Sequence, residues 1–284
     1  MLNKNIQTFI ACDSEYEESS IVLFGAGFDG TTSFRPGTRF APQAIRNESF
    51  GIETYSPYQD KDMLDYSYFD SGDLELPFGD TDEVLKEIQE RTQIIIDDEK
   101  IPFMIGGEHL VTLGAVREVS KKYHDIHIIH FDAHADLRDD YLGQKLSHAC
   151  VLRRCHEIVG DGHIFQFGIR SGERDEFIFA KEHTCMNKFD FSSLVETVEQ
   201  LKGKNIYLTV DLDVLDPSIF PGTGTPEAGG VTFNELREAL TIVCSKLNIV
   251  GCDVNELSPQ YDHSGVSTAV ACKIIREILL SLSK

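Results

Sequence analysis

The 284-residue sequence is poor in positive charge. It contains 26 lysines and arginines against 47 aspartates and glutamates, which gives a net charge of −21 at pH 7. Nucleic acids and anionic membrane surfaces attract lysine and arginine, so this balance argues against both as partners. It suits a cationic substrate or bound metal ions, although an acidic surface also serves solubility alone.

The sequence also lacks long apolar runs and paired-cysteine motifs. Its apolar runs stay far below the ~20 residues of a membrane helix, and residues 1–20 show no secretory leader. The seven cysteines are odd in number and contain no C-x-x-C spacing. We therefore expect a reduced, cytoplasmic protein with buried thiols and no disulfide framework.

Short apolar runs alternate with amphipathic stretches along the chain. The predicted strands, apolar on both faces as in a buried parallel sheet, are 21–25, 101–105, 127–131, 163–168, 205–210 and 249–252. The predicted helices are 81–100, 110–123, 149–159, 192–201, 233–246 and 267–283. This order predicts one α/β domain over residues 1–284, a three-layer α/β/α fold with a mostly parallel central sheet.

Local patterns refine this organisation. Thr232 and Glu235 stand three residues apart before an apolar-periodic stretch, a capping-box pattern that predicts a helix start. Residues 51–80 are irregular and acidic, and we expect them to form a surface excursion. The sequence shows no repeat, low-complexity tract or Ser/Gly-rich linker that would divide it into two domains.

Two glycine-rich stretches bear on nucleotide binding. Residues 25–30 match G-x-G-x-x-G after a predicted strand, but a loop-like sequence follows and offers no helix N-terminus to a pyrophosphate. Residues 222–230 lack the G-K-[ST] ending of a phosphate loop. A G-x-S-x-G elbow and an H-E-x-x-H zinc helix are also absent. We therefore expect ordinary turns here rather than a nucleotide site.

Acidic and histidine side chains follow three of the predicted strands. In an open parallel sheet, ligands gather at the carboxyl ends of the strands, which lie along one edge. A two-residue spacing keeps such side chains on one side of an extended chain. The side chains that this arrangement brings together are His109, Asp132, His134, Asp136, Asp211 and Asp213.

Four carboxylates and two imidazoles at neighbouring strand ends predict a metal site. Without cations these groups would repel one another and remain desolvated. Taken singly, His109 also suits a hydrogen-bonded position at a helix start, and Asp216 suits a turn. A calcium loop from Asp211 needs Gly at its sixth position and Glu at its twelfth, where the sequence has Asp216 and Gly222.

The donor types indicate which metal and how many ions. No cysteine joins the set, and mixed carboxylate and imidazole ligands suit Mn²⁺, with Co²⁺, Fe²⁺, Ni²⁺ or Zn²⁺ as substitutes. Six ligands are too many for one catalytic ion that keeps an open position. They predict two Mn²⁺ ions that share bridging carboxylates, a pair that supplies a strong nucleophile at neutral pH.

These motifs together resemble the ureohydrolase family, the arginase-like binuclear manganese enzymes. The matching pieces are GGEH (106–109), DAHAD (132–136), LSHAC (146–150), DLDVLDP (211–217), GTGTPEAGG (222–230) and DVNELSP (253–259). Residues 34–37 and 41–46 also resemble the family's N-terminal segment. The resemblance runs from about residue 20 to the C-terminus, and several motifs in the right order are more specific than any one of them.

The resemblance implies a role for each matching residue. One ion would be bound by His109, Asp132, Asp136 and Asp211. The other would be bound by Asp132, His134, Asp211 and Asp213, so that Asp132 and Asp211 bridge the two. Asp136 would also orient the nucleophile that attacks a guanidinium carbon. The family commonly forms trimers or hexamers, so a homo-oligomer is expected.

Two further residues complete the expected catalytic set. His148 matches the family's proton-transferring histidine and would protonate the leaving amine, since histidine titrates near neutral pH. Glu256 matches the carboxylate that holds the guanidinium, and carboxylates bind that planar group bidentately. Taken singly, His148 also suits a surface or capping position, and Glu256 a structural ion pair.

The substrate expected from these features is agmatine, converted to putrescine and urea. Arginine carries a carboxylate that Asp139 and Asp140, just after DAHAD, would repel, although Arg138 could serve a carboxylate. Arginine and other guanidino compounds such as guanidinobutyrate remain alternatives. A metal-dependent deacetylase with one Zn²⁺ and a noncatalytic metal-binding protein are further alternatives. The expected partner is thus a small cationic guanidino substrate.

Overall fold

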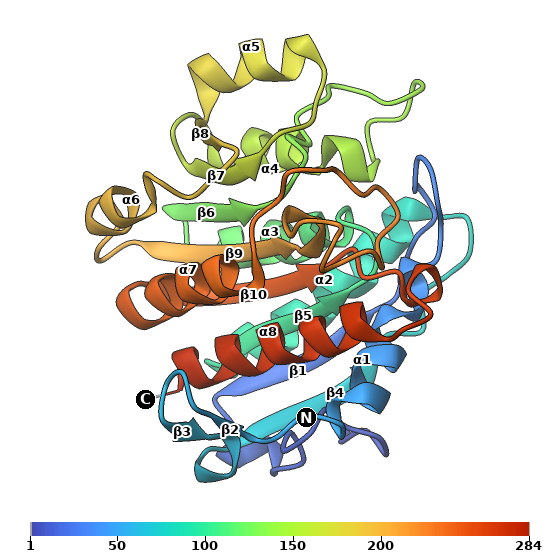
Figure 1. Cartoon of the computed structure of the whole chain (residues 1–284), viewed down its shortest axis with the longest axis vertical. Coiled ribbons are helices and arrows are strands. Elements are labelled where there is room, and N and C mark those ends of the chain that lie inside the picture. Colours follow the sequence, from blue (N-terminus) through green and yellow to red (C-terminus); the bar gives the residue numbers. More distant parts are fainter. Residues whose placement is uncertain (1, 284) are drawn as a thin grey trace.

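The computed structural model describes residues 2–283 and has three layers (Figure 1). The middle layer is an eight-stranded sheet in the order β4-β1-β5-β10-β9-β6-β7-β8. Every neighbouring pair in it is parallel. The strands are β1 (Ile21–Ala26), β4 (Tyr68–Asp73), β5 (Ile101–Gly106), β6 (Ile126–Phe131), β7 (Ile164–Ile169), β8 (Cys185–Lys188), β9 (Asn205–Asp211) and β10 (Asn248–Asn255). The predicted fold class is confirmed.

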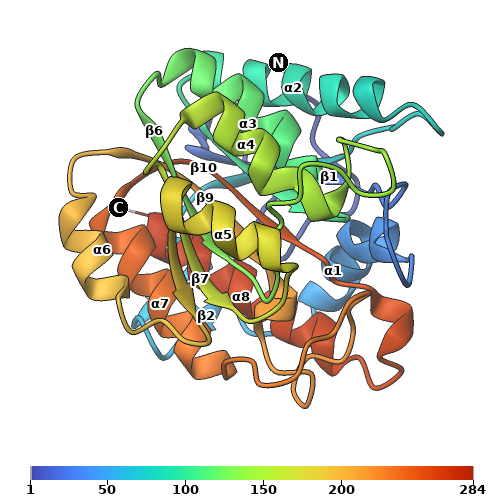
Figure 2. The same ribbon diagram turned by 90° about the horizontal axis from the view of Figure 1, so that it is seen from above.

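Helices cover both faces of the sheet (Figure 2). α2, α3 and α4 pack on one face, α1, α6, α7 and α8 pack on the other, and α5 lies near the β8 edge. The helices are α1 (Ala41–Ser49), α2 (Thr81–Asp97), α3 (Val111–Lys122), α4 (Val151–Val159), α5 (Arg174–His183), α6 (Leu194–Gln200), α7 (Phe233–Lys246) and α8 (Val266–Leu282). In residues 2–283, no helix has the length and apolar character needed to cross a bilayer.

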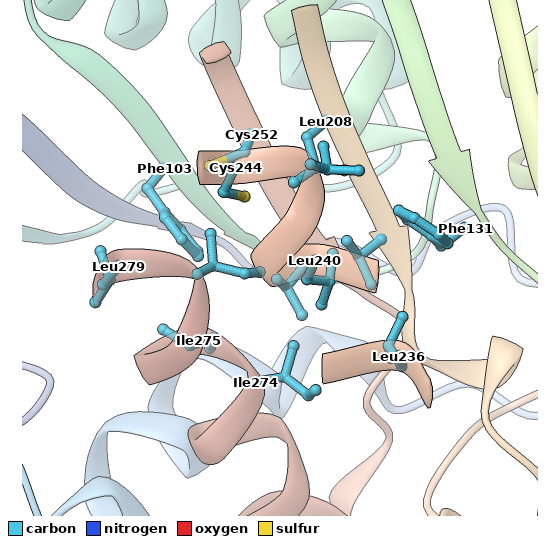
Figure 3. Close-up of a cluster of buried hydrophobic side chains, with 14 of the residues drawn as sticks. Phe103, Phe131, Leu208, Leu236, Leu240, Cys244, Cys252, Ile274, Ile275 and Leu279 are labelled. Atoms are coloured by element: carbon cyan, nitrogen blue, oxygen red, sulfur yellow. The ribbon is translucent and has the colours of Figure 1, made fainter. Parts of the chain in front are cut away.

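The core on the α7–α8 face shows why the strands are apolar on both sides. Leu240 on α7 and Leu279 on α8 are fully buried with Phe103 of β5 and Leu208 of β9 (Figure 3). The opposite face of the same strands packs against α2, α3 and α4. A strand between two helical layers is buried on both faces, which explains why the sequences of the predicted strands are apolar without alternation.

All six predicted strands and all six predicted helices are present, with ends that differ by a few residues. The predicted capping box at the start of α7 is also formed. Glu235 N–H donates to Thr232 Oγ1 at 3.3 Å, and Thr232 N–H donates to Glu235 Oε2 at 2.8 Å. Two orphan donors of the first turn are thereby satisfied by neighbouring side chains.

The prediction that residues 51–80 form only a surface excursion is wrong. This segment contains the short β2–β3 hairpin (Tyr55–Ser56 and Lys61–Asp62) and β4, an edge strand of the main sheet that pairs in parallel with β1. The structure also contains α1, α5 and β8, which the sequence did not predict. β4 contains two aspartates and β8 is short and partly exposed, so neither shows the pattern of a buried strand.

A buried ion pair explains how β4 tolerates an aspartate. Asp70 and Arg46 of α1 are both fully buried, and their side chains make two hydrogen bonds of 2.8 and 2.9 Å. Arg46 also pairs with Asp73 at the end of the strand. The backbone amide of Phe9 donates a hydrogen bond to Asp70 Oδ2 at 2.9 Å. This network joins α1 and the N-terminal segment to the sheet edge.

Replacing Arg46 by Met should lower the free energy of unfolding by about 3–5 kcal/mol, because it leaves the buried Asp70 carboxylate without its cation. Urea denaturation followed by circular dichroism measures the change. The matched control is Lys86→Met, which removes an exposed ion pair with Glu83 and should change stability by less than about 1 kcal/mol. Equal effects of the two substitutions would contradict the structural role of Arg46.

Candidate active site and metal centre

Four neighbouring strands in the middle of the sheet end at the candidate site. β5, β10, β9 and β6 are adjacent in that order, and their carboxyl ends lead into GGEH, DVNEL, DLD and DAHAD. All six side chains predicted to gather here lie together, and Glu256 joins them because β10 lies between β5 and β9. The position agrees with the rule that ligands gather at the carboxyl ends of parallel strands.

His109 is the centre of the first group. Its Nδ1 atom lies 3.0 Å from Asp132 Oδ2, 3.1 Å from Asp136 Oδ2 and 3.4 Å from Asp211 Oδ2. The ring is completely buried, and Nδ1 has no hydrogen-bond partner of acceptable geometry. A buried polar atom without a partner is costly unless something compensates it.

The other nitrogen of His109 shows which tautomer the protein favours. His109 Nε2 lies 2.8 Å from Thr209 Oγ1, and Thr209 Oγ1 donates its single proton to Asp253 Oδ1 at 2.6 Å. Thr209 can therefore only accept from His109, so the neutral ring carries its proton on Nε2 and its lone pair on Nδ1. Such a backing hydrogen bond is typical of metal-binding histidines.

The second group surrounds His134. His134 Nδ1 lies 3.1 Å from Asp213 Oδ2 and 3.5 Å from Asp132 Oδ1. Asp211 Oδ1 accepts a hydrogen bond from the Asp213 amide at 2.8 Å, which ties the last residue of β9 to the turn that follows it. Asp132 therefore lies between the two groups, with one carboxylate oxygen near each histidine, while Asp211 lies beside His109 and is hydrogen-bonded to the Asp213 amide.

The pKa shifts show that this cluster lacks positive charge. Burial and the neighbouring carboxylates of Asp213 and Asp132 raise the pKa of Asp211 well above its ordinary value. Burial lowers the pKa of His109, but the carboxylates around Nδ1 raise it well above the usual range. The cluster thus favours protons or cations at these positions. The unpartnered Nδ1 and the carboxylate and imidazole donors fit divalent metal ions.

Asp132 depends on a histidine that sequence reasoning missed. His130 is completely buried in β6, and its Nε2 lies 2.7 Å from Asp132 Oδ2. Burial raises the pKa of Asp132, but His130 and the other nearby histidines hold it well below its usual range. His130 lies in β6, two residues before Asp132, so the same two-residue spacing identifies it as a candidate. The apolar residues around it hide that signal.

Asp136 and Glu256 both adopt backbone conformations that are rare for residues with side chains. Their φ angles are 54° and 66°, in the left-handed region. The Asp136 carbonyl accepts from the amides of Leu152 and Arg153 in the first turn of α4, and the Glu256 amide donates to the carbonyl of Gly107. Such strain persists only where the surrounding structure enforces it, and it clusters at functional sites.

Glu108 anchors the loop that follows β1. It is completely buried, and its carboxylate accepts hydrogen bonds from the Thr31 amide and from the hydroxyls of Thr31 and Thr32. Gly107 lets the chain pass close to this loop, because a Cβ there would lie 2.0 Å from the Phe28 carbonyl oxygen. Burial raises the pKa of Glu108 to about 7.

The same loop holds His148. The Ser33 amide donates to His148 Nε2 at 3.1 Å, and the Thr31 hydroxyl accepts from the His148 amide. The lone pair on Nε2 places the ring proton on Nδ1, which lies 3.6 Å from Glu256 Oε1. Burial lowers the pKa of His148, but the carboxylates of Glu256 and Glu108 raise it to about 9. The Ser33 contact opposes a second proton on the ring.

A cavity of about 260 Å³ opens onto these residues. His134, Asp136, His148 and Asp211 line it, as do Ser33, Arg138, Tyr141, Ser171, Glu173, Glu176 and Thr225. The guanidinium of Arg138 lies 2.9 Å from Glu173 and 3.5 Å from Glu176. Nothing in the sequence pattern indicated Ser33 or Glu173, because both come from loops that only the fold brings to the site.

The structure does not support the expected role of Asp139 and Asp140, which was to repel the carboxylate of arginine. Asp139 and Asp140 do not line the cavity. Asp139 instead pairs with Arg154 of α4 at 2.9 Å, and Asp140 accepts a hydrogen bond from the Gly143 amide within its own turn. Both are loop residues with local partners, so neither can repel a substrate carboxylate by contact.

Comparison with known proteins identifies the family. The sequence matches the Arginase family over residues 19–281. It is 46% identical to the agmatinase of Bacillus subtilis over 98% of this chain and 97% of that protein. The solved structure of a proposed agmatinase from Clostridium difficile is 57% identical, with a TM-score of 0.93, and covers 95% of this chain and 99% of its own. The agmatine ureohydrolase of Thermoplasma volcanium is 34% identical, with a TM-score of 0.88 over 98% of this chain and 94% of its own.

The chain therefore belongs to the arginase family, and the resemblance noted in the sequence is confirmed. The match spans nearly the whole chain and nearly the whole of each relative. The fold and the His/Asp clusters at the strand ends agree with this membership.

Glu108→Gln should change the pH dependence of stability in the metal-free protein. A buried carboxyl whose folded-state pKa is about 7 binds its proton more tightly when folded, so stability falls as pH rises from about 4.5 to 7. Glutamine cannot ionise. As pH rises across this range, the free energy of unfolding of the variant should therefore increase by about 3 kcal/mol relative to that of wild type. Urea denaturation at several pH values measures this difference. A constant difference between the two proteins would contradict the shift.

Proposed function

We propose that this protein is an agmatinase, a hydrolase that cleaves the guanidino C–N bond of agmatine to give putrescine and urea. The observation that carries the proposal is the cluster of six His and Asp side chains at the strand ends, with Glu256 and His148 beside it and a cavity that reaches the cluster at His134, Asp136 and Asp211. The near-full-length identity to proteins named agmatinases supports it.

The cluster is proposed to hold two Mn²⁺ ions. His109, Asp132, Asp136 and Asp211 are assigned to one ion. Asp132, His134, Asp211 and Asp213 are assigned to the other. When bound, the two ions supply an activated nucleophile at neutral pH. The buried, unpartnered Nδ1 of His109 and the Asp132 carboxylate, whose two oxygens lie near His109 and His134, support this assignment.

Three side chains are assigned catalytic roles. Asp136 orients the nucleophile, and its enforced left-handed conformation keeps the carboxylate directed toward the cluster. Glu256 binds the planar guanidinium of the substrate. His148 then lies within 4 Å of that carboxylate and holds a proton on Nδ1, so it is placed to protonate the departing amine.

The charge of the cavity wall suits agmatine. Two carboxylates, from Glu173 and Glu176, face one guanidinium, that of Arg138. The wall therefore keeps an excess of negative charge, and Arg138 is already paired. A dicationic substrate is attracted to such a wall, whereas the carboxylate of arginine is not. Arginine or a guanidino acid is the second candidate, because Arg138 lines the cavity and could bind a carboxylate if it left its partners.

The protein is further proposed to act in the cytoplasm as a homo-oligomer, a trimer or hexamer, built from one domain per chain. The cysteines in the structure are unpaired, which suits a reducing compartment. Large apolar side chains such as Phe34, Phe78 and Leu142 are exposed by 70%, 93% and 87%, and contacts between subunits would cover such groups.

Urea release tests the proposal directly. Protein stripped with a chelator and reloaded with Mn²⁺ should release urea from agmatine and far less from arginine, because of the charge of the cavity wall. Urea from arginine instead would keep the reaction and overturn the substrate. No urea from either compound, with two metals bound per chain, would point to other guanidino compounds or to a noncatalytic protein. One bound zinc would favour a deacetylase.

Asp132→Asn should leave little bound manganese and almost no turnover, because the carboxylate lies between both groups. Metal analysis of the purified variant and urea release from agmatine provide the two readouts. Near-normal metal content and activity would refute the assignment of Asp132 to both ions.

The matched comparison is His148→Ala. This variant should keep both metals yet lose ~10²-fold or more in turnover, as loss of a general acid usually does. If its metal content fell instead, His148 would be a ligand or a structural residue rather than a proton donor.

A further inference from the structure

A second group of histidines and an aspartate lies at the opposite ends of the strands. His156 is on α4, Asp161 is in the turn before β7, and His183 is the last residue of α5, just before β8. His156 Nε2 and His183 Nδ1 each lie 2.7 Å from the same oxygen, Asp161 Oδ1. These elements lie together at the β8 end of the molecule (Figures 1 and 2).

We propose that His156, Asp161 and His183 bind one divalent transition-metal ion, zinc by preference. Two imidazoles and a carboxylate form a donor set that zinc binds with ligand distances of about 2.0–2.2 Å, with water in the fourth position. Tetrahedral geometry then separates the ligand atoms by about 3.3 Å. The distances between Asp161 Oδ1 and the two histidine nitrogens must therefore increase by roughly half an ångström to admit the ion. The exposed side chain of Asp161 can make this movement.

The two rings are held in place before any ion binds. Phe179 stacks on the ring of His183 with centroids 4.2 Å apart and meets the ring of His156 edge-on at 5.0 Å. The amides of Gly160 and Gly162 donate to the carbonyls of His156 and His183. The φ angles of these glycines are 83° and 74°, a conformation that other residues rarely adopt, so the turn that carries Asp161 is tied to both helix ends.

Charge distinguishes this cluster from the neighbouring group of Asp125, His127 and His163. There, Lys204 Nζ lies 2.6 Å from Asp125 Oδ2 and already neutralises the carboxylate. Within residues 2–283, no lysine or arginine lies within 4.0 Å of Asp161, and only the two imidazoles face it. A cation therefore meets an uncompensated carboxylate in a strongly acidic protein, which favours its binding.

The site would tie together two helices that also hold the wall of the candidate active site. The first turn of α4 donates two amides to the Asp136 carbonyl, and Glu176 of α5 accepts from the Leu137 amide. An ion at the other ends of α4 and α5 links them without touching the cavity. We therefore expect it to stabilise the fold and to leave the chemistry unchanged, so the inference does not depend on the proposed function.

Zinc titration of the Mn²⁺-loaded protein tests the site. Wild type should retain one more zinc per chain than His156→Asn/His183→Asn, and an anomalous diffraction map at the zinc edge should place it between the three side chains. At a hundredfold excess over its Kd, zinc should raise the Tm of wild type by about 5 °C and not that of the double variant. Asp161→Asn should weaken binding at least tenfold through loss of charge.

The matched control is His124→Asn/His263→Asn, which removes two exposed histidines outside the cluster and should bind zinc as wild type does. Equal zinc content in wild type and the cluster variant, with no anomalous peak at Asp161, would overturn the proposal and leave the cluster as a hydrogen-bonded brace. Urea release from agmatine, measured on the same samples, separates this outcome from a failure of the proposed function.

Discussion

The negative charge at the carboxyl ends of β5, β6 and β9 is the constraint on which the site depends. Four carboxylates meet there with two histidines, and the centre of the group, His109 Nδ1, is buried without a hydrogen bond. Only positive charge makes such an arrangement stable. The surrounding residues, Thr209 behind His109 and His130 behind Asp132, hold the donors in place for it. The parallel sheet provides the rigid frame that this repulsive cluster requires.

A loop from the N-terminal part of the chain completes the site. The Ser33 amide binds the ring of His148, and the Thr31 hydroxyl binds its backbone amide. The Glu108 carboxylate accepts a hydrogen bond from the Thr31 amide and so holds the loop in place. The proton-carrying side of the ring therefore faces Glu256, which lies beside the cluster. A buried carboxyl that secures a loop of neutral donors holds His148 in a defined position.

The strands and helices of the middle of the sheet could be predicted because their burial shows in local patterns. The elements that were missed are those where tertiary contacts override those patterns. β4 carries Asp70 into the interior because Arg46, from a different segment, neutralises it. No pattern within β4 itself contains that information. β8 is an edge strand with one neighbour, so it needs little apolar surface.

By itself, the sequence determined the α/β class, the strand-end positions of His109, Asp132 and Asp211, and the arginase family, because strand periodicity and motif spacing are local properties. Only the tertiary structure decided what each group faces. It assigned the proton on His109 through Thr209, paired Arg138 with two glutamates, and turned Asp139 toward Arg154 and away from the cavity. It also brought His156 and His183 to one aspartate. Such contacts join residues far apart in the chain, and their distances follow from packing rather than from spacing.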